Sequence, residues 1–124
     1  MRLLLDTPVI LWWLDDAPDL SEEAKHLLAS ADAVHISAFS PWEITSKQHL
    51  GLLEGPGYLA ERVRDLAFPS LHVTAAHGVR AGRLPLVHED PFDRLLIAQA
   101  QAHRLALVTR NALIPQYDVT VVRV

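Results

Sequence analysis

Short aliphatic segments alternate along this chain with segments that carry helical caps and helical spacing, and this alternation limits the possible folds more than any other feature. The strand-like segments are residues 2–6, 34–37, 70–73, 105–109 and 119–124, and the helix-like segments are residues 7–14, 21–31, 40–51, 58–67, 75–82 and 90–103. Strands joined by helices form βαβ units, which build a mostly parallel sheet with helices on both faces. We therefore predict an α/β fold with three layers, α/β/α, as one domain over residues 1–124.

The composition excludes several classes of protein. The chain has no cysteine, so it cannot form disulfides, thiolate nucleophiles or zinc–thiolate sites. No apolar segment reaches the length of about 18 residues that a membrane-spanning helix needs, and the opening MRLLLD does not resemble a signal peptide. With 11 Lys and Arg against 15 Asp and Glu, the net charge of −4 provides no broad basic face for nucleic acid. We expect a cytoplasmic protein without a membrane partner, in which only a bound cation would favour chemistry on phosphodiesters.

Three acids and one amide fall where a parallel sheet would bring them together. Asp6 ends the first strand-like segment, and Asn111 follows the fourth. Glu43 and Asp93 lie in the first turns of two helix-like segments. In an open parallel sheet, ligands bind beyond the carboxyl ends of the strands, near the point where the strand order reverses. We therefore expect these side chains, from four separate segments, to meet in one cleft.

Some of these acids also have a purely structural explanation. Ser40 and Glu43 have the spacing of a capping box, and Asp90 stands at the same spacing from Asp93. Acids in a first helical turn are stabilised by the helix dipole without any function. Asp6 differs from them, because an acid that ends a buried strand faces the crevice at the sheet edge.

A cluster of carboxylates in a partly buried site indicates a bound cation, because the charges otherwise repel one another. Oxygen ligands without cysteine or paired histidines favour Mg²⁺ or Mn²⁺ over zinc or copper. Such an ion orients a water, lowers its pKa and stabilises charge on a phosphoryl oxygen. The seven histidines lack the spacing of metal ligands and are interpreted as structural or surface residues. His88 is the exception, because it lies beside the expected cleft.

Four sequence blocks resemble those of PIN-domain proteins of the VapC toxin type. The first is LLLDT followed by VILWWL within residues 3–14, and the second is SAFSPWEI at residues 37–44, followed by Lys47 and by GLL at residues 51–53. The third block is DPFDRLLIAQA at residues 90–100, and the fourth is LVTR at residues 107–110. Because the blocks follow the family's order from residue 3 to residue 111, the resemblance covers essentially the whole predicted domain.

This resemblance implies a metal-dependent endoribonuclease, the toxin of a toxin–antitoxin pair, which hydrolyses RNA with a metal-activated water. It places Asp6, Glu43 and Asp93 at the family's metal-binding acids, with Mg²⁺ or Mn²⁺ as the ion. Asp90 matches a frequent companion of these acids and is a further candidate ligand. Arg110 is the candidate contact to the scissile phosphate.

The chain departs from the family pattern at two positions. Pro8 stands where the family commonly has histidine, and it suits the first turn of a helix that Thr7 is expected to cap. Asn111 stands where the family commonly has a fourth acid, which removes one negative charge from the cluster. Its amide oxygen is a candidate ligand, although it attracts a second divalent ion less strongly than a carboxylate would.

Two other interpretations stay open at this point. In the first, Asn111 leaves a PIN fold with weakened catalysis that retains only its interaction with an antitoxin or RNA. In the second, the chain is a phosphate-handling α/β domain such as a receiver or a phosphatase, although such folds need further acids beside the first-strand aspartate.

Two adjacent tryptophans predict a contact with partners. Trp12 and Trp13 point about 100° apart on a helix, so one ring is expected on the flank of the domain. Large apolar flanks usually mark an interface. The resemblance implies two uses for such a surface, a homodimer and the binding of a small antitoxin that occludes the site.

Overall fold

A parallel sheet runs through the centre of this protein, and its carboxyl edge carries the polar residues discussed below. The computed structural model describes residues 1–124 and arranges five strands in the order β3-β2-β1-β4-β5. The strands are β1 (Arg2–Leu5), β2 (Ala33–Ser37), β3 (Ser70–Leu71), β4 (Ala106–Thr109) and β5 (Val121–Arg123). All neighbouring strands pair in parallel, which confirms the predicted sheet. The strand order reverses between β1 and β4.

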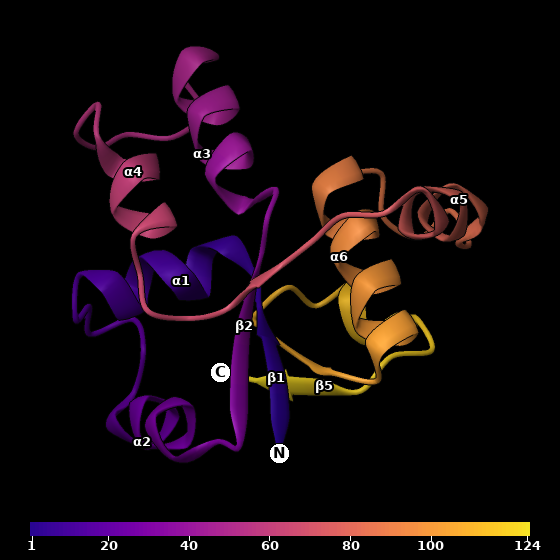
Figure 1. Ribbon diagram of the computed structural model, residues 1–124, viewed down its shortest axis with the longest axis horizontal. Coiled ribbons are helices and arrows are strands. Elements are labelled where there is room, and N and C mark those ends of the chain that lie inside the picture. The colour runs from indigo at the N-terminus through magenta and orange to yellow at the C-terminus, as the bar shows by residue number, and fades with distance from the viewer.

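Helices cover both faces of this sheet and form the predicted three layers (Figure 1). They are α1 (Thr7–Leu14), α2 (Glu22–Ser30), α3 (Ser40–His49), α4 (Leu59–Arg64), α5 (Ala75–Arg83) and α6 (Pro91–His103), with one 3-10 turn, η1 (Ile114–Gln116). The first four helices share one core with one face of the sheet, whereas α6 and η1 cover the other face and α5 packs on α6. None of the helices has the length and apolarity needed to cross a membrane.

The central strand β1 is apolar on both faces because helices bury both of them. Leu3 and Leu5 belong to the core beneath α1 to α4, whereas Leu4 belongs to the core beneath α6. Successive strand residues point to opposite faces of a sheet, so the three leucines fill both cores and are fully buried. The chain then reaches Asp6 at the carboxyl edge, where it leaves the sheet.

The predicted cap of the first helix is wrong by one residue. Asp6, rather than Thr7, is the N-cap of α1, because its backbone is extended (φ −75°, ψ 165°) and its Oδ1 accepts the Val9 N–H at 3.0 Å. Pro8 lies in the first turn of α1. Backbone N–H groups there have no partner within the helix, so the missing N–H of proline costs no hydrogen bond. Thr7 is consequently free to use its hydroxyl elsewhere.

The predicted capping box at the start of α3 is also wrong. Phe39 precedes this helix in a helical conformation, and no side chain caps the helix. Ser40 is fully buried and its hydroxyl has no hydrogen-bond partner. Glu43 is therefore not held by the helix start. By contrast, Asp90 caps α6 as predicted.

Three elements are shorter than predicted. The helix expected over residues 58–67 extends only from Leu59 to Arg64, and β3 and β5 contain two and three residues. The helix ends at Arg64, and Pro69 disfavours helical backbone angles at Phe68. Phe68 instead packs on the core.

Candidate metal centre

Asp6 directly follows β1, and both of its carboxylate oxygens are hydrogen-bonded. Its Oδ1 accepts the Val9 amide, and its Oδ2 accepts the Thr109 hydroxyl from the end of β4. The residue is only 4% exposed. Burial raises the pKa of Asp6 and outweighs the two hydrogen bonds, which lower it. The charges of Asp93 and Glu43 also act to raise it, and together these effects move the pKa from 3.8 to about 7. A cation beside Asp6 would replace the solvation that burial removes.

Glu43 lies in the first turn of α3 between two donors from different helices. Thr7 Oγ1, at the start of α1, donates to Glu43 Oε1 at 2.6 Å. Lys47 Nζ, one turn further along α3, donates to Glu43 Oε2 at 2.6 Å. The carboxylate is buried, so these two contacts determine where it lies.

Asp93 lies in the first turn of α6 and faces His88 and Asn111. The His88 Nε2 is 2.7 Å from Asp93 Oδ2, and the Asn111 Nδ2 is 3.4 Å from the same oxygen. Burial raises the pKa of Asp93; the His88 hydrogen bond opposes this increase, and the negative charges of Asp90 and Glu43 add to it. Asp93 thus resembles Asp6 in being a carboxyl group whose charged form is disfavoured without a cation.

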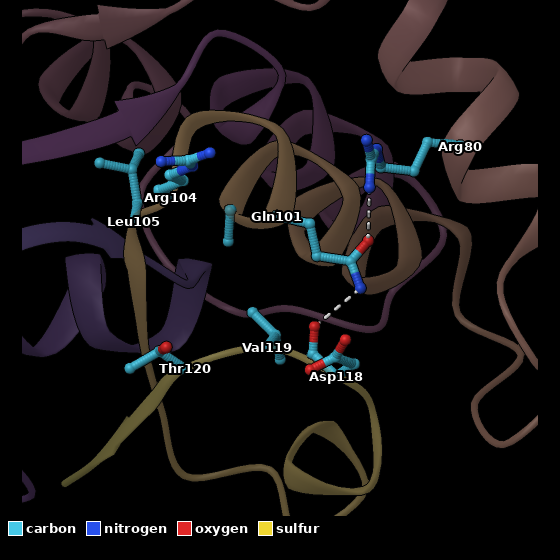
Figure 2. Close-up of a pocket in the computed structure, with 8 residues that line it drawn as sticks. Arg80, Gln101, Arg104, Leu105, Asp118, Val119 and Thr120 are labelled. Atoms are coloured by element: carbon cyan, nitrogen blue, oxygen red, sulfur yellow. Dashed lines mark hydrogen bonds between the residues drawn. The ribbon is translucent and has the colours of Figure 1, made fainter.

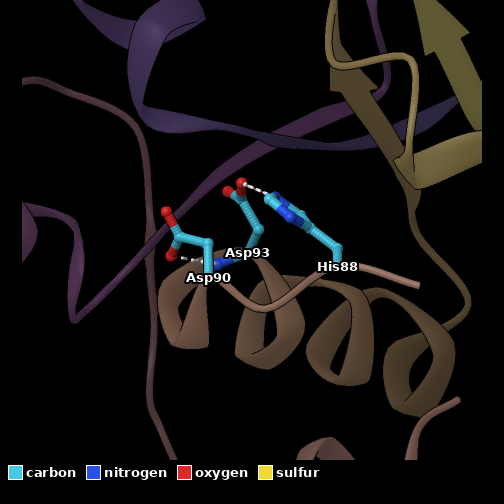
Figure 3. A group of neighbouring side chains, drawn as sticks. All are labelled: His88, Asp90 and Asp93. Atoms are coloured by element: carbon cyan, nitrogen blue, oxygen red, sulfur yellow. Dashed lines mark hydrogen bonds and ion pairs between the residues drawn. The ribbon is translucent and has the colours of Figure 1, made fainter. Parts of the chain in front are cut away.

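Asp90 caps α6 with one carboxylate oxygen and faces Lys47 with the other. Its Oδ1 accepts the Phe92 and Asp93 amides at 2.8 and 3.3 Å, and its Oδ2 lies 3.5 Å from Lys47 Nζ. One ligand atom from each of His88, Asp90 and Asp93 lies within 4.8 Å of the others. Figure 3 shows these three side chains at the start of α6. This end of α6 therefore offers two carboxylates and an imidazole close together.

A cavity of about 290 Å³ connects these side chains. It is lined by Asp6, Pro8, Trp12, Glu43, Lys47, Asp93, Arg110 and Asn111. Carboxylates from the end of β1, the start of α3 and the start of α6 thus face one space. Hard oxygen donors of this kind fit Mg²⁺ or Mn²⁺. The raised pKa values of Asp6 and Asp93 agree with a site in which a cation is needed to offset burial and repulsion.

The sequence pattern of the PIN domain matches residues 3–119. This chain belongs to the PIN-domain family. The matched range contains all three acids of the cavity, and it confirms the family resemblance noted in the four sequence blocks. The receiver or phosphatase interpretation is therefore excluded.

Relatives of this PIN domain align with nearly its whole length. It is 32% identical over 118 residues to Ribonuclease VapC22 of Mycobacterium tuberculosis (strain ATCC 25618 / H37Rv). The alignment covers 88% of this chain and 86% of the relative. Its fold is similar to VapBC2 from Rickettsia felis bound to a DNA fragment from their promoter (TM-score 0.74, 18% identity, 99% and 98% of the two chains). It is also similar to FitAcB from Neisseria gonorrhoeae (TM-score 0.69, 21% identity, 97% and 96% of the two chains).

Asn111 presents a donor, rather than an acceptor, to the centre of this PIN domain. Its Oδ1 accepts the Leu113 amide at 2.9 Å, which determines the orientation of the side-chain amide. The Nδ2 therefore faces His88 and Asp93, at 3.1 and 3.4 Å. In this arrangement the oxygen expected as a ligand is directed toward the backbone.

Arg110 lines the cavity while two of its N–H groups are already used. Its Nε donates to the Val124 carbonyl at 2.7 Å and its Nη2 donates to the Asp19 carbonyl. The guanidinium carbon lies 4.3 Å from the centre of the Trp12 ring. Its Nη1 makes no hydrogen bond within the PIN domain.

Sequence reasoning missed three residues that position the acids. The sequence predicts Thr7 only as a cap, and Lys47 and Thr109 lie within the family blocks without a predicted role. Lys47 had a local signal, because residues four apart on a helix are neighbours and Lys47 follows Glu43 by four. Thr7 and Thr109 had none, since each meets its acid through a tertiary contact.

A larger polar pocket of about 450 Å³ lies at the other end of α6 and does not belong to this centre (Figure 2). Gln101 contacts residues on both sides of this pocket. Its Oε1 accepts a hydrogen bond from Arg80 Nη1 at 3.5 Å, and its Nε2 donates to the Asp118 carbonyl at 3.0 Å. The pocket contains two arginines and one aspartate, Arg80, Arg104 and Asp118. It lacks the clustered carboxylates that a divalent cation requires.

Proposed function

We propose that this PIN domain is a metal-dependent endoribonuclease, the toxin of a toxin–antitoxin pair, with Mg²⁺ or Mn²⁺ as its ion. The observation that carries the proposal is the meeting of Asp6, Glu43 and Asp93 in one cavity at the sheet edge. The relative named Ribonuclease VapC22, at 32% identity over most of both chains, supports RNA as the substrate.

In the proposed mechanism Asp6 and Asp93 would be the principal ligands, and Glu43 would hold the ion or its water. The bound ion would lower the pKa of a water and stabilise charge on the phosphoryl oxygen. The Val9 amide and the Thr109 hydroxyl orient Asp6, and Thr7 and Lys47 orient Glu43.

The substrate phosphate would contact Arg110, whose Nη1 remains unbonded at the cavity wall. Asp90 mainly caps α6, and it comes within reach of an ion through Oδ2, the oxygen that faces Lys47. Asn111 would donate to Asp93 rather than bind the ion, because its oxygen accepts the Leu113 amide.

A PIN-fold binding protein with weakened catalysis is the second candidate. The orientation of Asn111 favours it, since the cavity lacks a fourth acid and an amide N–H faces Asp93. Such a protein would still bind an antitoxin or RNA but would cleave slowly or not at all.

Cleavage of labelled structured RNA with Mg²⁺, Mn²⁺ or EDTA separates these two functions. Asp6→Asn and Asp93→Asn remove one charge each with little change of shape, and Asn also retains the cap of α1. Both variants should abolish cleavage while circular dichroism shows an unchanged fold, and the exposed Glu54→Gln should cleave normally. Wild-type protein that binds Mn²⁺ without cleaving any RNA would support the binding protein instead.

We also propose a small antitoxin partner and a homodimer. Several structural neighbours are toxin–antitoxin assemblies, among them a toxin–antitoxin complex from Klebsiella pneumoniae. A basic antitoxin segment would complement the acids of the cavity.

The dimer prediction began with the two adjacent tryptophans, and the structure leaves both indoles half-buried. Trp13 lies against Phe68, with ring centres 5.7 Å apart, and Trp12 lies beneath Arg110. Light scattering at micromolar concentration should give the mass of two chains, and a monomer would contradict the homodimer without affecting the metal centre.

A further inference from the structure

Lys47 forms ion pairs with two acids of the metal centre, Glu43 and Asp90. We propose that Lys47 is a positioning residue whose ammonium group takes the place of a second cation, so that the centre binds a single divalent ion. This inference rests on the proposed function, because it concerns the same centre.

The Lys47 ammonium bridges two carboxylates from different helices. Its Nζ lies 2.6 Å from Glu43 Oε2 on α3 and 3.5 Å from Oδ2 of Asp90, the cap of α6. The ring of Phe92 lies on another side of the ammonium, with its centre 5.8 Å away. A divalent ion that bridged Glu43 and Asp90 would occupy this same position.

The pair of Lys47 and Glu43 differs from an ordinary ion pair along a helix. Exposed pairs with this spacing stabilise a helix only weakly, because solvent screens them. Here the Glu43 side chain is 5% exposed and the Lys47 side chain 32% exposed. A buried carboxylate without a partner is costly, so Glu43 needs a cation whether or not a metal ion is bound.

No lysine or arginine forms an ion pair with the other two acids, Asp6 and Asp93. Asp6 accepts only neutral donors, from the Val9 amide and the Thr109 hydroxyl. Asp93 faces a neutral amide, Asn111, and the ring of His88. The centre therefore has two sides. On one side Lys47 offsets the charges of Glu43 and Asp90, and on the other side Asp6 and Asp93 need a metal ion.

Counting bound ions tests this division directly. Mn²⁺ binding to the full chain is measured by calorimetry, with free Mn²⁺ quantified by electron paramagnetic resonance and no RNA present. Wild-type protein and Lys47→Arg should bind one Mn²⁺ per chain. Lys47→Met should bind a second Mn²⁺, because Glu43 and Asp90 then lack their cation. The matched control is Lys25→Met, which removes a lysine paired with the exposed Asp16 and should leave the count at one.

A double variant locates the additional ion. Adding Glu43→Gln to Lys47→Met removes both partners of the pair, and the count should return to one. Lys47→Gln, whose amide can still donate to Glu43, replaces Lys47→Met if thermal melting shows that the latter does not fold. Two ions on the wild-type protein, or one ion bound with unchanged affinity after Lys47→Met, would overturn the proposal.

The outcome is separable from that of the ribonuclease. Wild-type protein that binds one Mn²⁺ but cleaves no RNA would contradict the proposed activity and support the ion count. Wild-type protein that cleaves RNA with two bound ions would contradict only the role of Lys47. If Lys47 had only a structural role, Lys47→Met would change the melting temperature and leave the number of bound ions at one.

Discussion

The Thr109 hydroxyl donates a hydrogen bond to the Asp6 carboxylate across 103 residues of sequence. The two residues end the neighbouring parallel strands β4 and β1, where the strand order reverses. The oxygen of the same hydroxyl accepts a hydrogen bond from the backbone N–H of Asn111 at 3.1 Å. Thr109 therefore connects the buried acid of the centre to the segment that directs Asn111 toward Asp93.

Thr109→Val should weaken metal binding in a way that depends on pH. The Thr109 hydrogen bond lowers the pKa of Asp6, so its loss should raise that pKa further above 7. An increase of one unit, from about 7 to about 8, reduces the ionised fraction at pH 7, and hence the Mn²⁺ affinity, by about fivefold. Mn²⁺ titrations at pH 7 and pH 9 measure this, with the exposed Thr120→Val as control. An equal loss of affinity at both pH values would mean that Thr109 acts only on geometry.

The metal-free protein should lose stability as the pH rises from about 4 to about 7. Folded Asp6, with a pKa of about 7, holds a proton that the unfolded carboxyl group, with a pKa of 3.8, has already lost. Protonation therefore favours the folded state in this interval, and the free energy of unfolding decreases with increasing pH. The raised pKa of Asp93 acts in the same direction.

Asp6→Asn should remove most of this pH dependence. The variant cannot ionise at residue 6, and Asn still caps a helix well. Above pH 7 it should be more stable than wild type by on the order of 1–3 kcal/mol, which is several degrees in Tm. Thermal melts in EDTA between pH 5 and pH 8.5 test this, and parallel curves for the two proteins would contradict it.

Metal binding to the wild-type protein should tighten with increasing pH and release a proton. The ion needs the ionised form of Asp6, so affinity for Mn²⁺ should rise about tenfold between pH 6 and pH 8. Calorimetry in buffers with different ionisation enthalpies measures the released proton. Saturation at one hundred times the Kd should stabilise the fold by about 2.7 kcal/mol, and EDTA should reverse this gain. An affinity that does not change with pH would show that Asp6 is not a ligand.

Asn111→Asp should tighten metal binding and destabilise the metal-free protein. The Nδ2 lies 3.4 Å from Asp93 Oδ2, so a carboxylate oxygen in its place would repel Asp93. The expected loss is on the order of 1 kcal/mol at pH 8 without metal, and Mn²⁺ should reverse it. Asn111→Ala, which adds no charge, is the control for loss of the amide.

RNA cleavage by the same variant distinguishes the two proposed functions. If Asn111 limits catalysis, Asn111→Asp should cleave RNA faster than the wild-type protein at equal Mg²⁺. An unchanged rate, together with unchanged Mn²⁺ affinity, would remove residue 111 from the centre.

Local patterns were sufficient to predict the architecture of this protein. The LLL run of β1 and the aliphatic segment of β4 were recognisable as buried strands, because both faces of a central parallel strand are covered. The position of Asp6 at the end of such a strand then predicted its place at the sheet edge. Helix boundaries were less accurate, since Asp6 replaced Thr7 as a cap and Phe39 left Ser40 without a capping role.

The chemistry of the centre depends on contacts that no local pattern contains. The pKa of Asp6 reflects burial beneath helices and a hydrogen bond from Thr109, and Glu43 is held by Thr7 across 36 residues. The direction of the Asn111 amide follows from the Leu113 N–H and the course of the chain after β4. Periodicity and capping act between residues a few positions apart, so they specify elements and the edge where acids gather. Burial and hydrogen bonding join residues far apart in sequence, and they determine which acids carry protons, which carry partners and where an ion can bind.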